Sequence, residues 1–181
     1  LARLDWKASL NWTISLSGGQ VTGDDGESEA FEAMYLHPNF KIGNVLFNYN
    51  PAGVTSDELS IFDASVNNVR YARLDFLYES SSWKFNVGFL MAQADVAASS
   101  GSLAFQHSDT YVFSANEDQD NAYGTEFDLD ITYLMNPNVE VFFSSGVLLT
   151  GDFYAFDNST STEIETANPV FTSAGITVKF N

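Results

Sequence analysis

Three carboxylate side chains stand at alternate positions in the stretch TEFDLDITYL: Glu126, Asp128 and Asp130. Alternate residues of a strand share a face, so neighbouring carboxylates in this row would lie about 7 Å apart. That separation suits general acid and base catalysis. A row of acidic side chains along the wall of a β-structure explains the same spacing without any reaction. We therefore predict that the row lines a wall and that the chain is not an enzyme.

A second acidic cluster, TGDDGESE, has the oxygen density of a calcium-binding loop. Its candidate ligands are Asp24, Asp25, Glu27 and Glu29, but they lack the full spacing of an EF-hand. The stretch NEDQDN at 116–121 is similar. We expect solvated acidic loops at a cell surface, which at most bridge a divalent cation. No other cofactor is expected.

The composition excludes several other functional classes. The chain has no cysteine, which removes disulfides, thiolate metal sites, a catalytic thiol and covalent haem attachment. His37 and His107 are isolated, and no nucleophile elbow, phosphate loop, dinucleotide fingerprint or HExxH motif occurs. With 24 acidic and 7 basic residues the net charge is -17, which argues against a nucleic-acid partner.

The elements that would carry these charges show a two-residue period. From Ala2 to Ser17 the even positions are apolar and the odd positions are polar or charged. This pattern is typical of a β-strand with one apolar and one polar face. Read as a single strand, residues 2–17 would be about 50 Å long, well beyond an ordinary strand of about 5–6 residues.

The same period recurs at 69–79, 83–91, 125–134, 139–151 and 170–180. Tight turns are expected at 80–82 and 135–138, and long, polar, acidic connections at about 18–69, 96–122 and 153–168. Within the first connection, FKIGNVLFNY is weakly strand-like, with Gly43 at a possible bulge, but we expect a loop that folds partly on itself. Short turns at one end and long loops at the other are typical of an outer-membrane barrel.

The polar faces of these expected strands collect most of the charged strand residues. The candidate pore-lining residues are Arg3, Asp5, Lys7, Arg73, Asp75, Lys84, Glu126, Asp128, Asp130, Glu140 and Lys179, with Arg70 added at a strand end. Charges of both signs on an inner wall orient water and ions and set selectivity. Cross-strand ion pairs that merely fill the wall are the alternative.

The apolar faces favour a membrane as their surroundings. Tyr78 and Trp83 flank one expected turn and Tyr133 precedes another, as in the aromatic girdles of membrane barrels. No apolar run approaches 18 residues, so no transmembrane helix is expected, but alternating barrel strands escape such a scan. A soluble sandwich with aromatic rings in its core is the alternative.

Six strands are too few for a closed membrane barrel, since the smallest have about eight. We therefore predict an all-β fold, an antiparallel transmembrane β-barrel, of which this chain supplies the C-terminal strands. Residues 1–181 would form a single barrel segment of a longer protein. A barrel shared by several chains is the less favoured alternative.

Three stretches together resemble the alginate-export-type outer-membrane porins of bacteria. SGGQVTGDDGESEAFEAMYLHPNF is similar to an acidic loop of that family. SVNNVRYARLDFLYESSSWKFNVGFLMAQAD and NAYGTEFDLDITYLMNPNVEVFFSSGVLLTGDFY are similar to two of its hairpins. The resemblance covers most of residues 17–180. It implies a wide barrel of roughly 16–18 strands, with an N-terminal part preceding this segment.

The predicted function is passive diffusion of small cationic or neutral hydrophilic solutes through a channel in the outer membrane of a Gram-negative bacterium. Rings of acidic residues would favour cations. Expected partners are outer-membrane lipid, lipopolysaccharide, small solutes, and a partner protein or further copies of the chain. Alternatives are a barrel that sheathes a partner such as a multihaem cytochrome, a lipase-like barrel, and a soluble secreted β-sandwich or adhesin.

Overall fold

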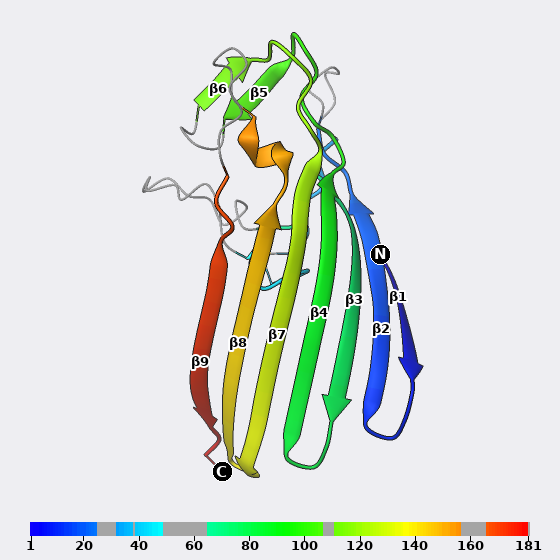
Figure 1. Ribbon diagram of the computed structural model, residues 1–181, viewed down its shortest axis with the longest axis vertical. Helices are drawn as coiled ribbons and strands as arrows, with labels where there is room; N and C mark the ends of the chain where they lie inside the picture. Colours follow the sequence, from blue (N-terminus) through cyan, green and yellow to red (C-terminus); the bar gives the residue numbers. More distant parts are fainter. Residues whose placement is uncertain (25–31, 38, 49–64, 107–110, 157–165, 181) are drawn as a thin grey trace.

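The computed structural model describes residues 1–24, 32–37, 39–48, 65–106, 111–156 and 166–180. The fold is all-β and is dominated by one seven-stranded antiparallel sheet in the order β1-β2-β3-β4-β7-β8-β9 (Figure 1). Its strands are β1 (Ala2–Lys7), β2 (Trp12–Val21), β3 (Val69–Glu79), β4 (Trp83–Ala94), β7 (Ala122–Asn136), β8 (Val139–Thr150) and β9 (Val170–Val178). The sheet is open, and no closed barrel forms among the described residues.

The expectation of one strand over residues 2–17 is wrong, because this stretch is a hairpin. β1 and β2 pair with each other, with Lys7 opposite Thr13, and Ser9 Oγ accepts the backbone N–H of Trp12 in the turn. Five residues separate the paired Lys7 and Thr13. An odd number keeps even positions on the same face of both strands, so the alternation continues through the turn. The sheet therefore has seven strands rather than six.

The other expected strands form close to their expected positions. Tight turns at 80–82 and 137–138 join β3 to β4 and β7 to β8, and they lie at the same end of the sheet as the β1–β2 turn (Figure 1). The long connections gather at the opposite end. The connection after β4 contains a hairpin that the sequence analysis missed, formed by β5 (Leu103–Gln106) and β6 (Tyr111–Ser114). A short 3-10 helix, η1 (Asp152–Ala155), follows β8.

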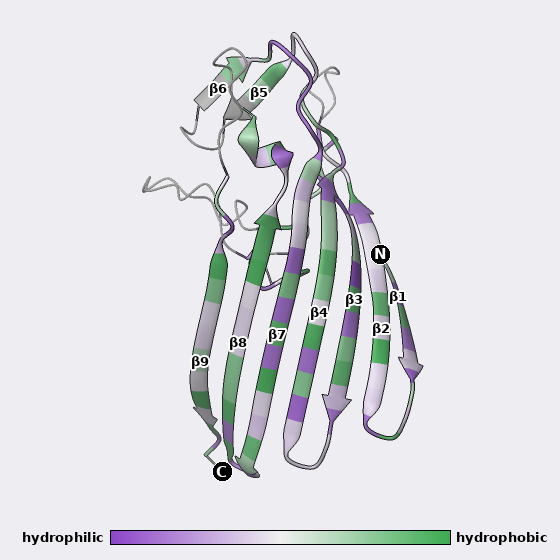
Figure 2. Ribbon diagram, in the orientation of Figure 1, coloured by the Kyte–Doolittle hydropathy of each residue, from purple (hydrophilic) through white to green (hydrophobic). Residues whose placement is uncertain are grey.

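The register confirms that the sheet has two chemically different faces. Because paired residues of an antiparallel sheet share a face, the register places Ser15, Asp75, Gly88, Asp128 and Gly146 in one row. We call this side the polar face and the opposite side the apolar face. Figure 2 shows the resulting alternation of hydrophilic and hydrophobic bands along β3, β4 and β7.

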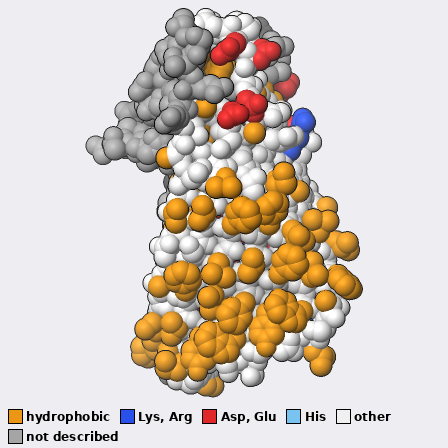
Figure 3. Space-filling view, viewed as in Figure 1, with side chains coloured by type: hydrophobic (Ala, Val, Ile, Leu, Met, Phe, Trp, Pro, Cys, Tyr) orange, Lys and Arg blue, Asp and Glu red, His pale blue; other side chains and the backbone are white. Residues whose placement is uncertain are grey.

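The apolar face is exposed across all seven strands. Figure 3 shows hydrophobic side chains spread over most of this face. Large side chains there keep 36–70% of their surface exposed: Leu4, Trp6, Trp12, Leu16, Phe76, Trp83, Val87, Met91, Phe127, Leu129, Leu149, Val170, Ile176 and Val178. Among the charged residues of the seven strands, only Arg70 lies on this face. Soluble monomers rarely expose a continuous apolar surface of this extent.

A continuous row of aromatic rings borders the apolar face near the short turns. Ring centroids lie 5.1 Å apart for Trp12 and Tyr78, 5.9 Å for Tyr78 and Phe85, and 5.4 Å for Phe85 and Trp83. Trp83 and Tyr133 continue the row at 4.5 Å. The three aromatic residues that the sequence analysis singled out thus join one row that spans four strands.

Polar side chains border the apolar face at its other end. Gln20, Arg70 and Gln93 are register neighbours there, and Asp95 accepts hydrogen bonds from Gln20 Nε2 and Arg70 Nε, each at 2.6 Å. Trp12 and Gln20 are eight positions apart on β2, or about 26 Å along the strand. A strand tilt of about 40° reduces this to a height of about 20 Å, close to the apolar band of about 25 Å on outer-membrane barrels. Among the described residues, no helix is long and apolar enough to span a membrane.

Candidate functional site

The register gathers the sequence-predicted charged residues on the polar face. Those within strands are Arg3, Asp5, Lys7, Arg73, Asp75, Lys84, Glu126, Asp128, Asp130 and Glu140. Lys179 follows the last residue of β9, on the same alternation. Arg70 is the exception, because it points from the apolar face. Glu79, which the candidate set left out, also lies on the polar face, where its carboxylate pairs with Lys84 at 2.9 Å.

A segment of the first long connection, residues 40–48, covers the half of the polar face nearer the long connections. Ile42, Val45 and Leu46 are at most 5% exposed and pack in a core with residues of the sheet. The sheet contributes Val21, Val69, Leu90, Ala92, Ala94, Tyr123 and Leu148 to this core. The described part of this connection therefore packs against the sheet, whereas the sequence analysis expected a loop from about residue 18 that folds partly on itself.

Glu126 is the main attachment point of this segment. Its side chain is fully buried, and its two carboxylate oxygens accept the backbone N–H groups of Val45 and Leu46, each at 2.7 Å. A carboxylate that accepts charge-assisted hydrogen bonds from two adjacent amides holds a loop strongly. A Cβ at Gly43 would come within 2.6 Å of Glu126 Oε1, so only glycine fits this position. Gly43 thus permits a close approach of backbone to carboxylate rather than the bulge suggested by sequence.

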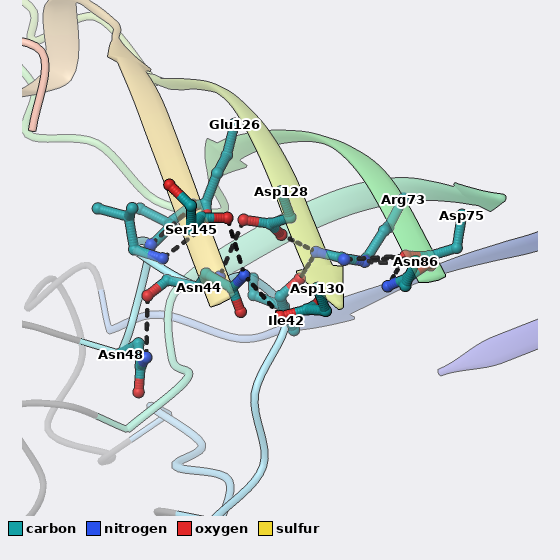
Figure 4. Close-up of polar contacts among 12 residues, drawn as sticks. Ile42, Asn44, Asn48, Arg73, Asp75, Asn86, Glu126, Asp128, Asp130 and Ser145 are labelled. Carbon is teal, nitrogen blue, oxygen red and sulfur yellow. Dashed lines mark hydrogen bonds and ion pairs between the residues drawn. The ribbon is translucent and has the colours of Figure 1, made fainter. Parts of the chain in front are cut away.

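Arg73 connects the segment to two strands of the wall. Its guanidinium pairs with Asp75 at 2.8 Å and with Asp128, and it donates to the carbonyl oxygen of Ile42 at 2.8 Å (Figure 4). The side chains of Arg73 and its two partners are 12%, 10% and 0% exposed. A Cβ at Gly88 would lie 2.2 Å from Arg73 Nη2, so this glycine leaves the space that the guanidinium occupies.

Asn44 extends the contact to the third acidic residue of β7. Its Nδ2 donates to Asp130 Oδ1 and to the Ser145 carbonyl oxygen, each at 3.2 Å, and its backbone N–H donates to Asp128 at 3.3 Å (Figure 4). All three carboxylates of the Glu126–Asp128–Asp130 row therefore bind residues 44–46. The row is a structural anchor for the covering segment, and this role was not visible from sequence.

The half of the polar face near the short turns is open. The exposed pair Arg3–Asp5, at 2.9 Å, lies on the edge strand β1 in the register rows of Arg73 and Asp75. The open half carries the exposed pair Glu79–Lys84, together with Glu140. Lys7 and Lys179 are also exposed there. The whole polar face carries seven acidic and five basic residues. The acidic residues are Asp5, Asp75, Glu79, Glu126, Asp128, Asp130 and Glu140, and the basic residues are Arg3, Lys7, Arg73, Lys84 and Lys179. This wall can therefore attract cations only weakly, because most of the net charge of -17 lies elsewhere.

Most of the acidic-loop metal candidates lie outside the part of the chain that the structure describes. Asp25, Glu27 and Glu29 lie outside the described residues, and Asp24 is exposed. In the described part of the chain, no group of three or more histidine, cysteine, aspartate or glutamate side chains is arranged to hold a metal ion.

Comparison with models of known protein families finds no match for this chain, and comparison with curated proteins finds no relative. The resemblance to alginate-export-type porins stays a prediction.

Proposed function

We propose that the seven-stranded sheet is part of the wall of a transmembrane β-barrel in a bacterial outer membrane, and that the barrel is a channel for small hydrophilic solutes. The observation that carries this proposal is the separation of faces. Seven strands expose a continuous apolar surface on one side and hold nearly all their charged side chains on the other. Lipid outside and water inside would satisfy both faces.

The covering segment supports a narrowed channel rather than a sheath around a large partner. Residues 42–46 already lie over the polar face of β3, β7 and β8 and are held there by buried carboxylates. A pore narrowed in this way selects small solutes by size. The polar face as a whole carries seven acidic and five basic side chains, and the long connections are acidic, so we propose a weak preference for cations.

Conductance of the intact protein in a planar bilayer, with a salt gradient across it, tests this function. We expect a steady current, and a small reversal potential whose sign shows a weak preference for cations. A protein that inserts fully but passes no current would contradict the channel. A protein that stays in solution without detergent would contradict the membrane wall.

An arginine in the middle of the apolar face tests the lipid contact directly. Leu16 is 53% exposed and lies four positions from both Trp12 and Gln20 on β2, so Leu16→Arg would place a charge near the centre of the lipid. In lipid vesicles we expect the free energy of unfolding to fall by about 2–4 kcal/mol. Thr177→Arg is the matched control, because Thr177 is exposed on the polar face opposite Glu140, and its effect should be small. Equal effects of the two substitutions would contradict a lipid-facing surface.

Neutralising lumen charges tests selectivity. Asp130 and Glu140 lie on the polar face without being fully buried, so Asp130→Asn with Glu140→Gln should reduce the cation preference. A unit charge about 7 Å from an ion in water contributes about 0.6 kcal/mol, and salt reduces this by about half. Because the variant removes two charges and each acts in opposite directions on cations and anions, we expect the ratio of cation to anion permeability to fall by about five- to tenfold. Asp118→Asn in a long connection is the control. An unchanged reversal potential would exclude these two residues from selectivity.

A further inference from the structure

The two outermost strands of the sheet, β1 and β9, each have one side that pairs with no other strand of the described residues. The exposed apolar surface continues to both edges, with Leu4 and Trp6 on β1 and Val170 and Ile176 on β9 all more than 60% exposed. Neither strand contains proline, neither pairing contains a bulge, and β9 has no charged residue. Sheets whose edge strands face solvent usually protect them with proline, a β-bulge or charged residues. Both edges are therefore suited to pair with another strand.

The two edge strands run in the same direction. Six consecutive antiparallel pairings connect β1 to β9, and both strands run toward the short turns (Figure 1). A closed barrel in which every pairing is antiparallel has an even number of strands. Joining β9 directly to β1 would create a parallel pair in an otherwise antiparallel sheet. The seven strands thus need an odd number of additional strands to close.

We propose that β1 and β9 are docking edges for one antiparallel wall with an odd number of strands, and that this wall is not a second copy of the chain. The inference rests on the proposed membrane barrel. The wall would be apolar outside and polar inside, in continuity with the faces described above. Its first and last strands would run from the short turns toward the long connections, antiparallel to the edges they meet.

Strand direction excludes copies of this chain from that role. Copies inserted in the same orientation meet with β9 of one beside β1 of the next, and these strands are parallel. Pairing of β9 with β9 of another copy would be antiparallel, but it requires one copy to be inverted. Long acidic connections would then emerge on both sides of the membrane, whereas barrels keep short turns on one side.

Cysteine cross-linking on the protein extracted from its own membrane tests the proposal, because the chain has no cysteine of its own. Ser144→Cys with Ser173→Cys is the positive control, since these residues are register partners on β8 and β9. The test variant combines Ser173→Cys with Asp5→Cys on β1. It is repeated with Arg3→Cys or Lys7→Cys in place of Asp5→Cys to cover other registers. A short bifunctional maleimide reagent is used throughout.

We expect cross-linking in the control and none in the test variants, either within a chain or between chains. An electron-microscopy structure of the same extracted protein should show an even number of strands in the barrel. The strand beside each edge should run from the short turns toward the long connections. A β1–β9 cross-link, a dimer joined through Ser173→Cys alone, or an odd strand count would overturn the inference while leaving a membrane barrel in place. Absence of the protein from the membrane fraction would instead overturn the proposed function itself.

Discussion

Arg73→Met is expected to destabilise the protein by about 3–5 kcal/mol, because it removes the counter-charge of two buried carboxylates. The side chains of Asp75 and Asp128 are 10% and 0% exposed, and the Arg73 guanidinium pairs with both of them. Methionine has a similar length and no charge, so the carboxylates would lose their charged partner without a large change in packed volume. The carbonyl oxygen of Ile42 would lose its donor as well. Urea unfolding of the protein in lipid vesicles measures the difference.

Arg3→Met is the matched control for this experiment. Arg3 also pairs with an aspartate two residues away on the same face, at 2.9 Å, but the two side chains are 57% and 49% exposed. Exposed ion pairs contribute about 0–1 kcal/mol, so this variant should be nearly as stable as the unmodified protein. If both variants lost the same stability, the Arg73 cluster would not be the buried anchor that its contacts indicate.

Much of the sheet could be predicted from the sequence because one local rule governs it. Alternation alone placed Phe76, Val87 and Phe127 on one face and Asp75, Asn86 and Asp128 on the other, as the register confirms. The rule failed at residues 8–12, where an odd-length turn reverses the chain without changing the phase of the pattern. The periodicity shows which face of the sheet each side chain lies on, but it does not show in which direction the chain runs. It therefore cannot distinguish one long strand from a hairpin of this kind.

The anchor of the covering segment could not be predicted from the same pattern. The sequence indicated that Glu126 faces inward, but the partners of its carboxylate are backbone amides some 80 positions away. Any residue type except proline supplies such an amide. The only local signals were Gly43 and Gly88, whose missing side chains leave room for Glu126 and Arg73. A glycine signals close approach without identifying what approaches.

Glu126→Ala is expected to release residues 42–46 from the wall and to widen the proposed channel. The substitution leaves the N–H groups of Val45 and Leu46 without their acceptors in a buried site. Each unsatisfied group costs about 1–3 kcal/mol, so the contact between segment and wall should weaken by about 2–6 kcal/mol. Larger single-channel conductance and more open-channel noise should accompany this loss. Planar-bilayer recording measures both.

Two further variants separate release of the segment from loss of a charge. Glu140→Ala removes a carboxylate from the same face beside the short turns, far from residues 42–46 along the strands, so it should leave the noise and the stability nearly unchanged. Glu126→Gln keeps one acceptor oxygen but presents an amide N–H₂ to the second backbone donor, so its effect should be intermediate. A conductance that followed charge alone would rise or fall equally in Glu126→Gln and Glu126→Ala. A conductance that rises from the unmodified protein to Glu126→Gln and again to Glu126→Ala would instead show that the Glu126 carboxylate determines the width of the channel by holding the segment in place.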